Sequence, residues 1–169
     1  AQMIVLVNAI SIREGGSLVV LISLLEKLAA RPGNLRWHVA VGDAVASEAL
    51  ARVPGIERSL HPWVSRSPLH VLFWYAVSLP RLARALNAGC LFSLTNYLPF
   101  RKLRIPTLLL VQNAGHFSGE FRRLTLQHEP GALARWIWAA KTRWVLRSIA
   151  QATMVTVQTA ALKRAIIAQ

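Results

Sequence analysis

Residues 3–28, MIVLVNAISIREGGSLVVLISLLEKL, decide the fold class of this chain. The stretch begins at residues 3–8 with an apolar, β-branched run, which predicts a buried strand. A polar loop with two glycines follows at residues 11–17, and from residue 17 to residue 30 apolar side chains recur at helical spacing. The stretch therefore predicts a strand, a loop and an α-helix in succession.

The same alternation continues along the rest of the chain. Further strands are predicted at residues 36–41, 56–60, 90–95, 105–112 and 153–158, and further helices at residues 47–53, 68–88, 131–149 and 160–167. Pro80 is expected to kink or split the second of these helices, and Thr159 is expected to cap the last one. Strands that alternate with helices predict an α/β fold, with a Rossmann-like parallel sheet flanked by helices on both faces and residues 1–169 forming one domain.

The composition excludes several classes of protein. Hydrophobic residues make up 54% of the chain and charged residues 16%, which is typical of a folded domain and not of a disordered chain. The apolar runs are all shorter than the roughly 20 residues that a membrane-spanning helix needs. The N-terminus carries no signal-peptide pattern, and the single Cys90 allows no internal disulfide. We therefore expect a cytoplasmic protein.

The charge is strongly positive. Twenty Lys and Arg residues against seven acidic residues give a net charge of +13, and residues 101–147 hold nine of the basic residues against two Glu. Such a field attracts partners that carry phosphate, including nucleic acid, an anionic membrane and phosphorylated small molecules. The sequence contains no nucleic-acid reading motif, so we expect no nucleic-acid partner.

Ligands of an open α/β sheet bind beyond the carboxyl ends of its strands, so the loops that follow strands are the first places to search. In the first such loop, Gly15, Gly16 and Ser17 begin a helix, where amide hydrogens and the helix dipole attract a phosphate. A purely structural turn is the alternative. The three-glycine dinucleotide fingerprint and the Walker lysine are both missing, which disfavours NAD and ATP, and we expect no cofactor.

The loops after the middle strands carry polar side chains. Asn96 and Tyr97 suit a hydroxyl-rich ligand because both can donate and accept hydrogen bonds, although Asn96 could equally be a plain turn former. Gln112, Asn113 and His116 follow the most apolar strand, and His116 could orient a sugar hydroxyl or transfer a proton, with a structural role as the alternative. The five histidines do not have the spacing of metal ligands, so we expect no metal site.

The predicted helix at residues 131–149 has two notable faces. One arc, suited to the core, holds Leu133, Ile137, Ala140 and Trp144. On another edge Trp136 lies beside Arg143 and Arg147, and a basic, aromatic edge of this kind can rest on anionic lipid headgroups. The alternative is an ordinary helix with its tryptophans in the core and its arginines in solvent.

Four segments, taken in order, resemble the amino-terminal domain of family 4 glycosyltransferases. They are EGGSLVVLISLLEKLA (14–29), SLTNYLPF (93–100), IPTLLLVQNAGHFSGEF (105–121) and RSIAQATMVTVQTAALKRAI (147–166). The last segment has a basic helix, small residues, an apolar strand that ends in Gln-Thr, and a short helix with Lys and Arg. This succession is typical of the family.

The resemblance implies that the chain is the acceptor-side half of a GT-B architecture. It implies that Gly15 and Gly16 lie near the donor diphosphate, and that Asn96, Asn113 and His116 line the acceptor side of the cleft. In this family a second Rossmann-like domain holds most contacts to the nucleotide sugar, and residues 1–169 do not include it. Because transfer requires donor and acceptor to be held together, we expect the isolated domain to be inactive.

For the intact enzyme the resemblance implies a nucleotide-sugar donor, a sugar or lipid-linked acceptor, and a role in cell-surface glycan synthesis. The basic, aromatic edge would then lie at the inner face of the membrane, as a peripheral contact with an anionic surface. The competing hypothesis, which depends on the +13 charge, is a nonenzymatic module that binds a membrane surface or nucleic acid.

Overall fold

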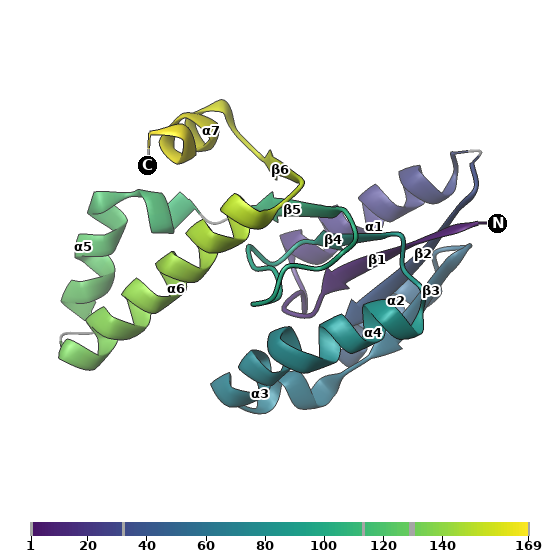
Figure 1. Cartoon of the computed structure of the whole chain (residues 1–169), viewed down its shortest axis with the longest axis horizontal. Helices are drawn as coiled ribbons and strands as arrows, with labels where there is room; N and C mark the ends of the chain where they lie inside the picture. Colours follow the sequence, from purple (N-terminus) through teal and green to yellow (C-terminus); the bar gives the residue numbers. More distant parts are fainter. Residues whose placement is uncertain (1, 32, 113, 129–130, 169) are drawn as a thin grey trace.

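The computed structural model describes residues 2–31, 33–112, 114–128 and 131–168. Its centre is a six-stranded sheet in the order β3-β2-β1-β4-β5-β6, with every neighbouring pair parallel (Figure 1). The strands are β1 (Met3–Ala9), β2 (Leu35–Val41), β3 (Ile56–Leu60), β4 (Cys90–Ser93), β5 (Thr107–Val111) and β6 (Met154–Val157). The strand order reverses between β1 and β4, so the predicted Rossmann-like α/β fold is confirmed.

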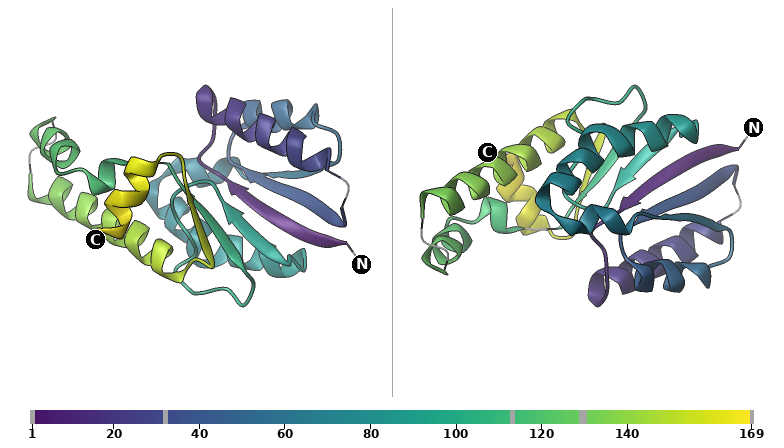
Figure 2. Two further views of the ribbon diagram at one scale, coloured as in Figure 1. Left: turned by 90° about the horizontal axis from the view of Figure 1, so that it is seen from above. Right: turned by 90° about the horizontal axis from the view of Figure 1, so that it is seen from below.

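Helices cover both faces of this sheet (Figure 2). They are α1 (Gly16–Ala29), α2 (Ala44–Ala51), α3 (Pro68–Phe73), α4 (Leu79–Ala85), α5 (Gly119–His128), α6 (Ala132–Gln151) and α7 (Ala160–Ile167), with short 3-10 helices η1 (Pro62–Arg66) and η3 (Ala114–Phe117) and a π-helical turn η2 (Trp74–Ser78). Helices α1 and α2 pack on one face, and α3, η2 and α4 pack on the other.

The central strand β1 divides the core into two layers. Val5 and Val7 belong to the cluster that includes α1 and α2, whereas Leu6 belongs to the cluster that includes η2 and α4. This alternation is the ordinary consequence of successive side chains pointing to opposite faces of a strand. Because both faces are covered, β1 is apolar along most of its length, and Asn8 is its one polar residue.

The helix predicted at residues 68–88 is split, as Pro80 led us to expect. The π-helical turn η2 separates α3 from α4, and Pro80 lies in the first turn of α4. Proline has no N–H to donate to the preceding turn and therefore conflicts with a continuous α-helix. The change to π-helical hydrogen bonding immediately before it removes this conflict.

Two other helices differ from the sequence prediction. Helix α2 begins at Ala44 because Asp43 caps it: the Asp43 carboxylate accepts from the amides of Val45, at 2.9 Å, and Ala46, at 3.3 Å. Helix α5 was not predicted from the sequence.

The core arc predicted for α6 is wrong in its first half. Leu133 is 70% exposed and Ile137 is 40% exposed, Ala140 is exposed, and only Trp144 is partly buried. A helix of 20 residues is about 30 Å long, whereas four- and five-residue strands such as β6 and β5 span only about 15 Å. The first half of α6 therefore projects beyond the sheet together with α5 (Figures 1 and 2).

The cap of α2 gives a first prediction. Asp43→Ala should lower the free energy of unfolding by about 1 kcal/mol, because two first-turn amides lose their acceptor. Asp43→Asn keeps a capping oxygen and should cost much less, as measured by urea denaturation. Equal losses in the two variants would contradict the capping role.

Candidate functional site

The three polar loops predicted from the sequence lie at one edge of the sheet. Strands β1, β4 and β5 are consecutive neighbours and run parallel, so the chain leaves all three at the same edge. The reversal of strand order falls between β1 and β4, and crevices for ligands in open α/β sheets form at such switch points. We call this edge the carboxyl rim.

The loop after β1 presents an open glycine pair. Gly15 has φ 73° and ψ −153°, a conformation that is essentially restricted to glycine, and it precedes the first residue of α1, Gly16. No described side chain caps this end of α1, and a Cβ built on either glycine would meet nothing within 4 Å. Ser17 donates to the Glu14 carbonyl at 3.3 Å. The start of α1 is therefore accessible to an anion.

The loops after β4 and β5 are joined by Asn96. This residue has φ 65°, and its side-chain oxygen accepts from the backbone amide of Gln112 at 2.7 Å. Asn96 is thus a turn former and also fixes the two loops to each other. Tyr97 is partly buried, with its ring centroid 4.3 Å from that of Trp144, and burial raises the pKa of its hydroxyl. Asn113 lies outside the described residues.

His116 lies in η3 and is held against α6. Its Nδ1 hydrogen-bonds with the Thr142 hydroxyl at 3.0 Å, and its ring centroid lies 6.1 Å from that of Trp138. Partial burial, followed by the positive charge of Lys141, lowers the pKa of His116 from its ordinary value of 6.5. The imidazole is therefore neutral near pH 7, the form that accepts a proton.

A buried polar network that the sequence did not reveal lies beneath the carboxyl rim. The Asn8 amide nitrogen is 3.1 Å from the Ser93 hydroxyl and 3.3 Å from the hydroxyls of Tyr75 and Thr95, and the Trp74 indole N–H donates to the Asn8 oxygen at 3.2 Å. All five residues are buried. Burial raises the pKa of Tyr75 to about 12, so its hydroxyl stays protonated. The network fixes the carboxyl ends of β1 and β4 relative to η2.

Helix α6 fastens the loop after β4 from outside. The Trp144 indole donates to the Leu98 carbonyl at 3.0 Å, and the Leu98 amide donates to the Ser148 hydroxyl at 2.9 Å. The Gln151 side chain donates to the Pro99 carbonyl at 2.7 Å. Three side chains from one helix therefore hold the backbone that carries Tyr97.

The basic, aromatic edge predicted on α6 is exposed, but one of its arginines also has a partner within the protein. Trp136 is 69% exposed and Arg143 is exposed, whereas the exposed Arg147 also donates to the Phe100 carbonyl at 3.0 Å. Arg147 therefore shares in fastening the loop.

This geometry defines the class of protein: it is a Rossmann-like domain with polar loops at the topological switch point of its sheet. A scan of protein-family models gives no match to the chain, and a search of curated proteins gives none.

Among the described residues, no three His, Cys, Asp or Glu side chains gather in a way that could hold a metal ion. No helix in the described parts of the chain is long and apolar enough to cross a bilayer.

Two partly buried histidines predict how stability changes with pH. Burial lowers the pKa of His61, with a further contribution from His38, and the pKa of His116 is lowered as well. Below the ordinary value of 6.5 the unfolded chain binds protons that the folded chain does not, so acidification should destabilise the fold. Above that pH the two groups should have no effect. The urea concentration at the unfolding midpoint should decrease as the pH is lowered below 6.5, and it should decrease less in a His61→Gln/His116→Gln variant. If the midpoint depended on pH equally in the wild type and the variant, this assignment would be contradicted.

Proposed function

We propose that this chain is the acceptor-side domain of a GT-B glycosyltransferase, which moves a sugar from a nucleotide-sugar donor to an acceptor. One observation carries the proposal. The open glycine pair at the start of α1 follows β1, and the two polar loops joined by Asn96 follow the neighbouring parallel strands β4 and β5, at the topological switch point of the sheet. Transfer of a sugar requires an anion site for the leaving diphosphate beside polar groups that hold hydroxyls. The carboxyl rim offers both kinds of group along one edge.

Each rim segment has a role in this proposal. The backbone amides at Gly15, Gly16 and Ser17 stabilise the negative charge of the diphosphate, aided by the dipole of α1. Tyr97 and the loop that contains Gln112 contact the hydroxyls of the acceptor. His116, neutral near pH 7, orients an acceptor hydroxyl or accepts its proton.

A second Rossmann-like domain completes the cleft in this proposal and holds most of the nucleotide sugar. The isolated chain should therefore bind a nucleoside diphosphate sugar weakly and turn over none of it, because one wall of a cleft does not hold donor and acceptor together. Isothermal titration calorimetry with the 169-residue chain tests this division. Tight, stoichiometric binding would contradict it.

We also propose that the edge formed by Trp136 and Arg143 contacts an anionic membrane surface, which fits a lipid-linked acceptor. The exposed indole beside an exposed guanidinium supports this contact. Sedimentation with anionic vesicles, compared with binding to DNA, separates it from the competing hypothesis of a general polyanion-binding module. Equal salt-dependent affinity for vesicles and DNA would favour that hypothesis.

A further inference from the structure

A large groove lies between α4 and the chain segment that leads into β5. It has a volume of about 1020 Å³, and five basic residues line it: Arg81, Arg84, Arg101, Lys102 and Arg104. The first two come from α4, and the other three come from the connection between β4 and β5, which contains no helix or strand. Two separate parts of the chain therefore bring their positive charges to one hollow.

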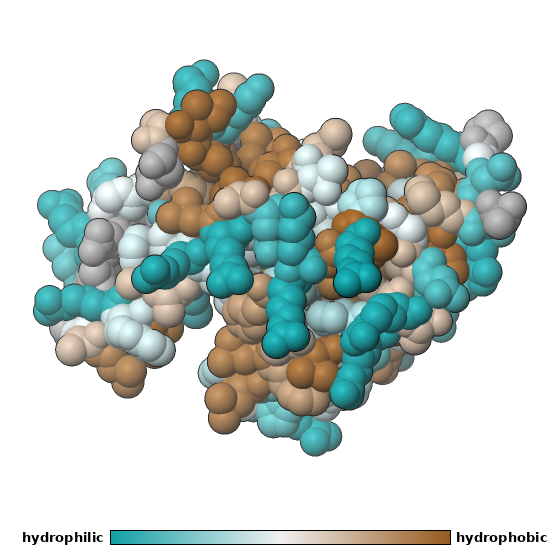
Figure 3. Space-filling view, in the orientation of Figure 1, coloured by the Kyte–Doolittle hydropathy of each residue, from teal (hydrophilic) through white to brown (hydrophobic). Residues whose placement is uncertain are grey.

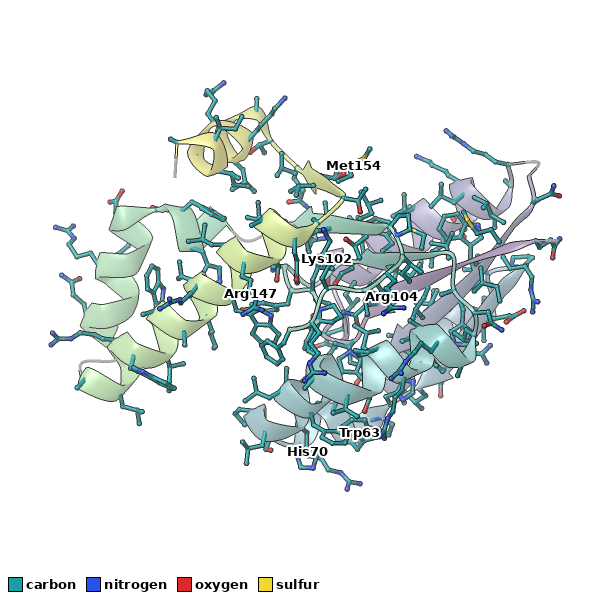
Figure 4. The ribbon with its side chains drawn as sticks, in the orientation of Figure 1. Trp63, His70, Lys102, Arg104, Arg147 and Met154 are labelled. Carbon is teal, nitrogen blue, oxygen red and sulfur yellow. The ribbon has the colours of Figure 1, made fainter. Side chains whose placement is uncertain are left out.

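The groove is distinct from the carboxyl rim. The end of α4 leads through Asn87 and Ala88, which line the groove, to the start of β4, and Ile105, which also lines it, comes just before β5. The groove is therefore near the amino ends of these strands. Figure 4 shows Lys102 and Arg104 on the face that also carries Arg147, and Figure 3 shows strongly hydrophilic side chains gathered over the middle of that face.

No lining residue balances the positive charge of the groove. None of the residues that line it is acidic, and all five basic residues are exposed. The ion pairs found among the described residues join Glu57 of the edge strand β3 to Arg36 and His38 of its neighbour β2. Within the groove, Arg84 donates to the Pro80 carbonyl at 3.4 Å, which fixes one guanidinium on α4.

The chemistry of these side chains selects the ligand. Guanidinium groups present parallel N–H donors that match phosphate oxygens, and Lys supplies a further point charge. A single phosphate carries at most two negative charges near neutral pH and cannot balance five cations. Apolar groups at Val77, Ala83 and Leu103 also line the same hollow.

We infer that this groove binds a ligand that carries two or more phosphate groups. The inference is independent of the proposed sugar transfer, because it involves none of the carboxyl-rim residues. The phosphates could belong to a free polyphosphate or to neighbouring lipid headgroups, and both present the same oxygens to the arginines.

Binding of tripolyphosphate and of phosphatidylglycerol vesicles to the 169-residue chain tests the inference, by calorimetry and by sedimentation at low ionic strength. The variant Arg81→Gln/Arg104→Gln removes one cation from each side of the groove. Arg31→Gln/Arg52→Gln removes two exposed cations that follow the carboxyl-terminal ends of α1 and α2, and it gives the same net charge as the groove variant. We expect roughly tenfold weaker binding in the groove variant and little change in the control.

Arg81→Lys/Arg104→Lys keeps the charge and loses the guanidinium geometry, so its affinity should lie between those of the wild type and the groove variant. If the groove variant loses affinity for tripolyphosphate alone, the ligand of the groove is a free polyphosphate. If it loses affinity for vesicles alone, the ligands are lipid headgroups. The inference is overturned if neither ligand binds, or if the groove and control variants weaken binding equally. Circular dichroism spectra establish that each variant is folded.

Discussion

Replacing Asn8 with alanine should lower the free energy of unfolding by about 3 kcal/mol, a large part of the roughly 5–15 kcal/mol typical of a domain. The Asn8 side chain accepts from the Trp74 indole at 3.2 Å and lies within hydrogen-bonding distance of three hydroxyls. Asn8 and Trp74 are fully buried, so water cannot replace the lost acceptor without opening the core. Urea denaturation measures the loss.

Tyr75→Phe is the matched control for this network. It removes one buried hydroxyl but leaves Thr95 in contact with Ser93, at 3.1 Å, and with Asn8, at 3.3 Å. The expected loss is about 1 kcal/mol. If Asn8→Ala cost no more than Tyr75→Phe, the network would not be fixing the ends of β1 and β4.

Gly15→Ala should lower the free energy of unfolding by about 1–3 kcal/mol, whereas Gly16→Ala should be neutral or raise it by up to about 1 kcal/mol. Neither added methyl group meets an atom within 4 Å, so packing does not distinguish the two variants. The difference is in the backbone: Gly15 has φ 73° and ψ −153°, and Gly16 is the first residue of a helix.

The same pair separates stability from ligand binding. In the intact enzyme that we propose, the methyl group of Gly16→Ala would occupy the open approach to the first amides of α1 and weaken binding of the donor diphosphate without unfolding the domain. Thermal denaturation and donor affinity, measured on both variants, give the comparison. Equal destabilisation by the two substitutions would contradict the backbone assignment at Gly15.

The fold was largely predictable because strand and helix periodicities differ. Apolar runs identified β1 and β5, and the capping oxygen of Thr159 was correctly expected, since it accepts from the amide of Leu162 at 3.1 Å. Periodicity shows which side chains share a face but not whether that face meets a partner. For this reason Leu133 and Ile137 were wrongly assigned to the core. Both are exposed, because they lie in the first half of α6, which projects beyond the sheet.

The site was predictable only where residues are close in sequence. The positions of the loops followed from the strands that precede them, and the structure leaves the roles of Gly16 and His116 as predictions. The buried network joins Asn8 to Tyr75, 67 positions away, and to Thr95, 87 positions away, so no local pattern reveals it. The basic groove likewise depends on the packing of α4 beside residues 101–104.

In our proposal the carboxyl rim is one wall of a sugar-transfer cleft. Chemical-shift mapping of the 15N-labelled chain during titration with a nucleoside diphosphate sugar tests it most directly, in the Arg81→Gln/Arg104→Gln background so that the basic groove does not compete. We predict weak binding with shifts concentrated at Gly15, Gly16 and Gln112. Tight stoichiometric binding, or shifts confined to the opposite edge of the sheet, would contradict the claim.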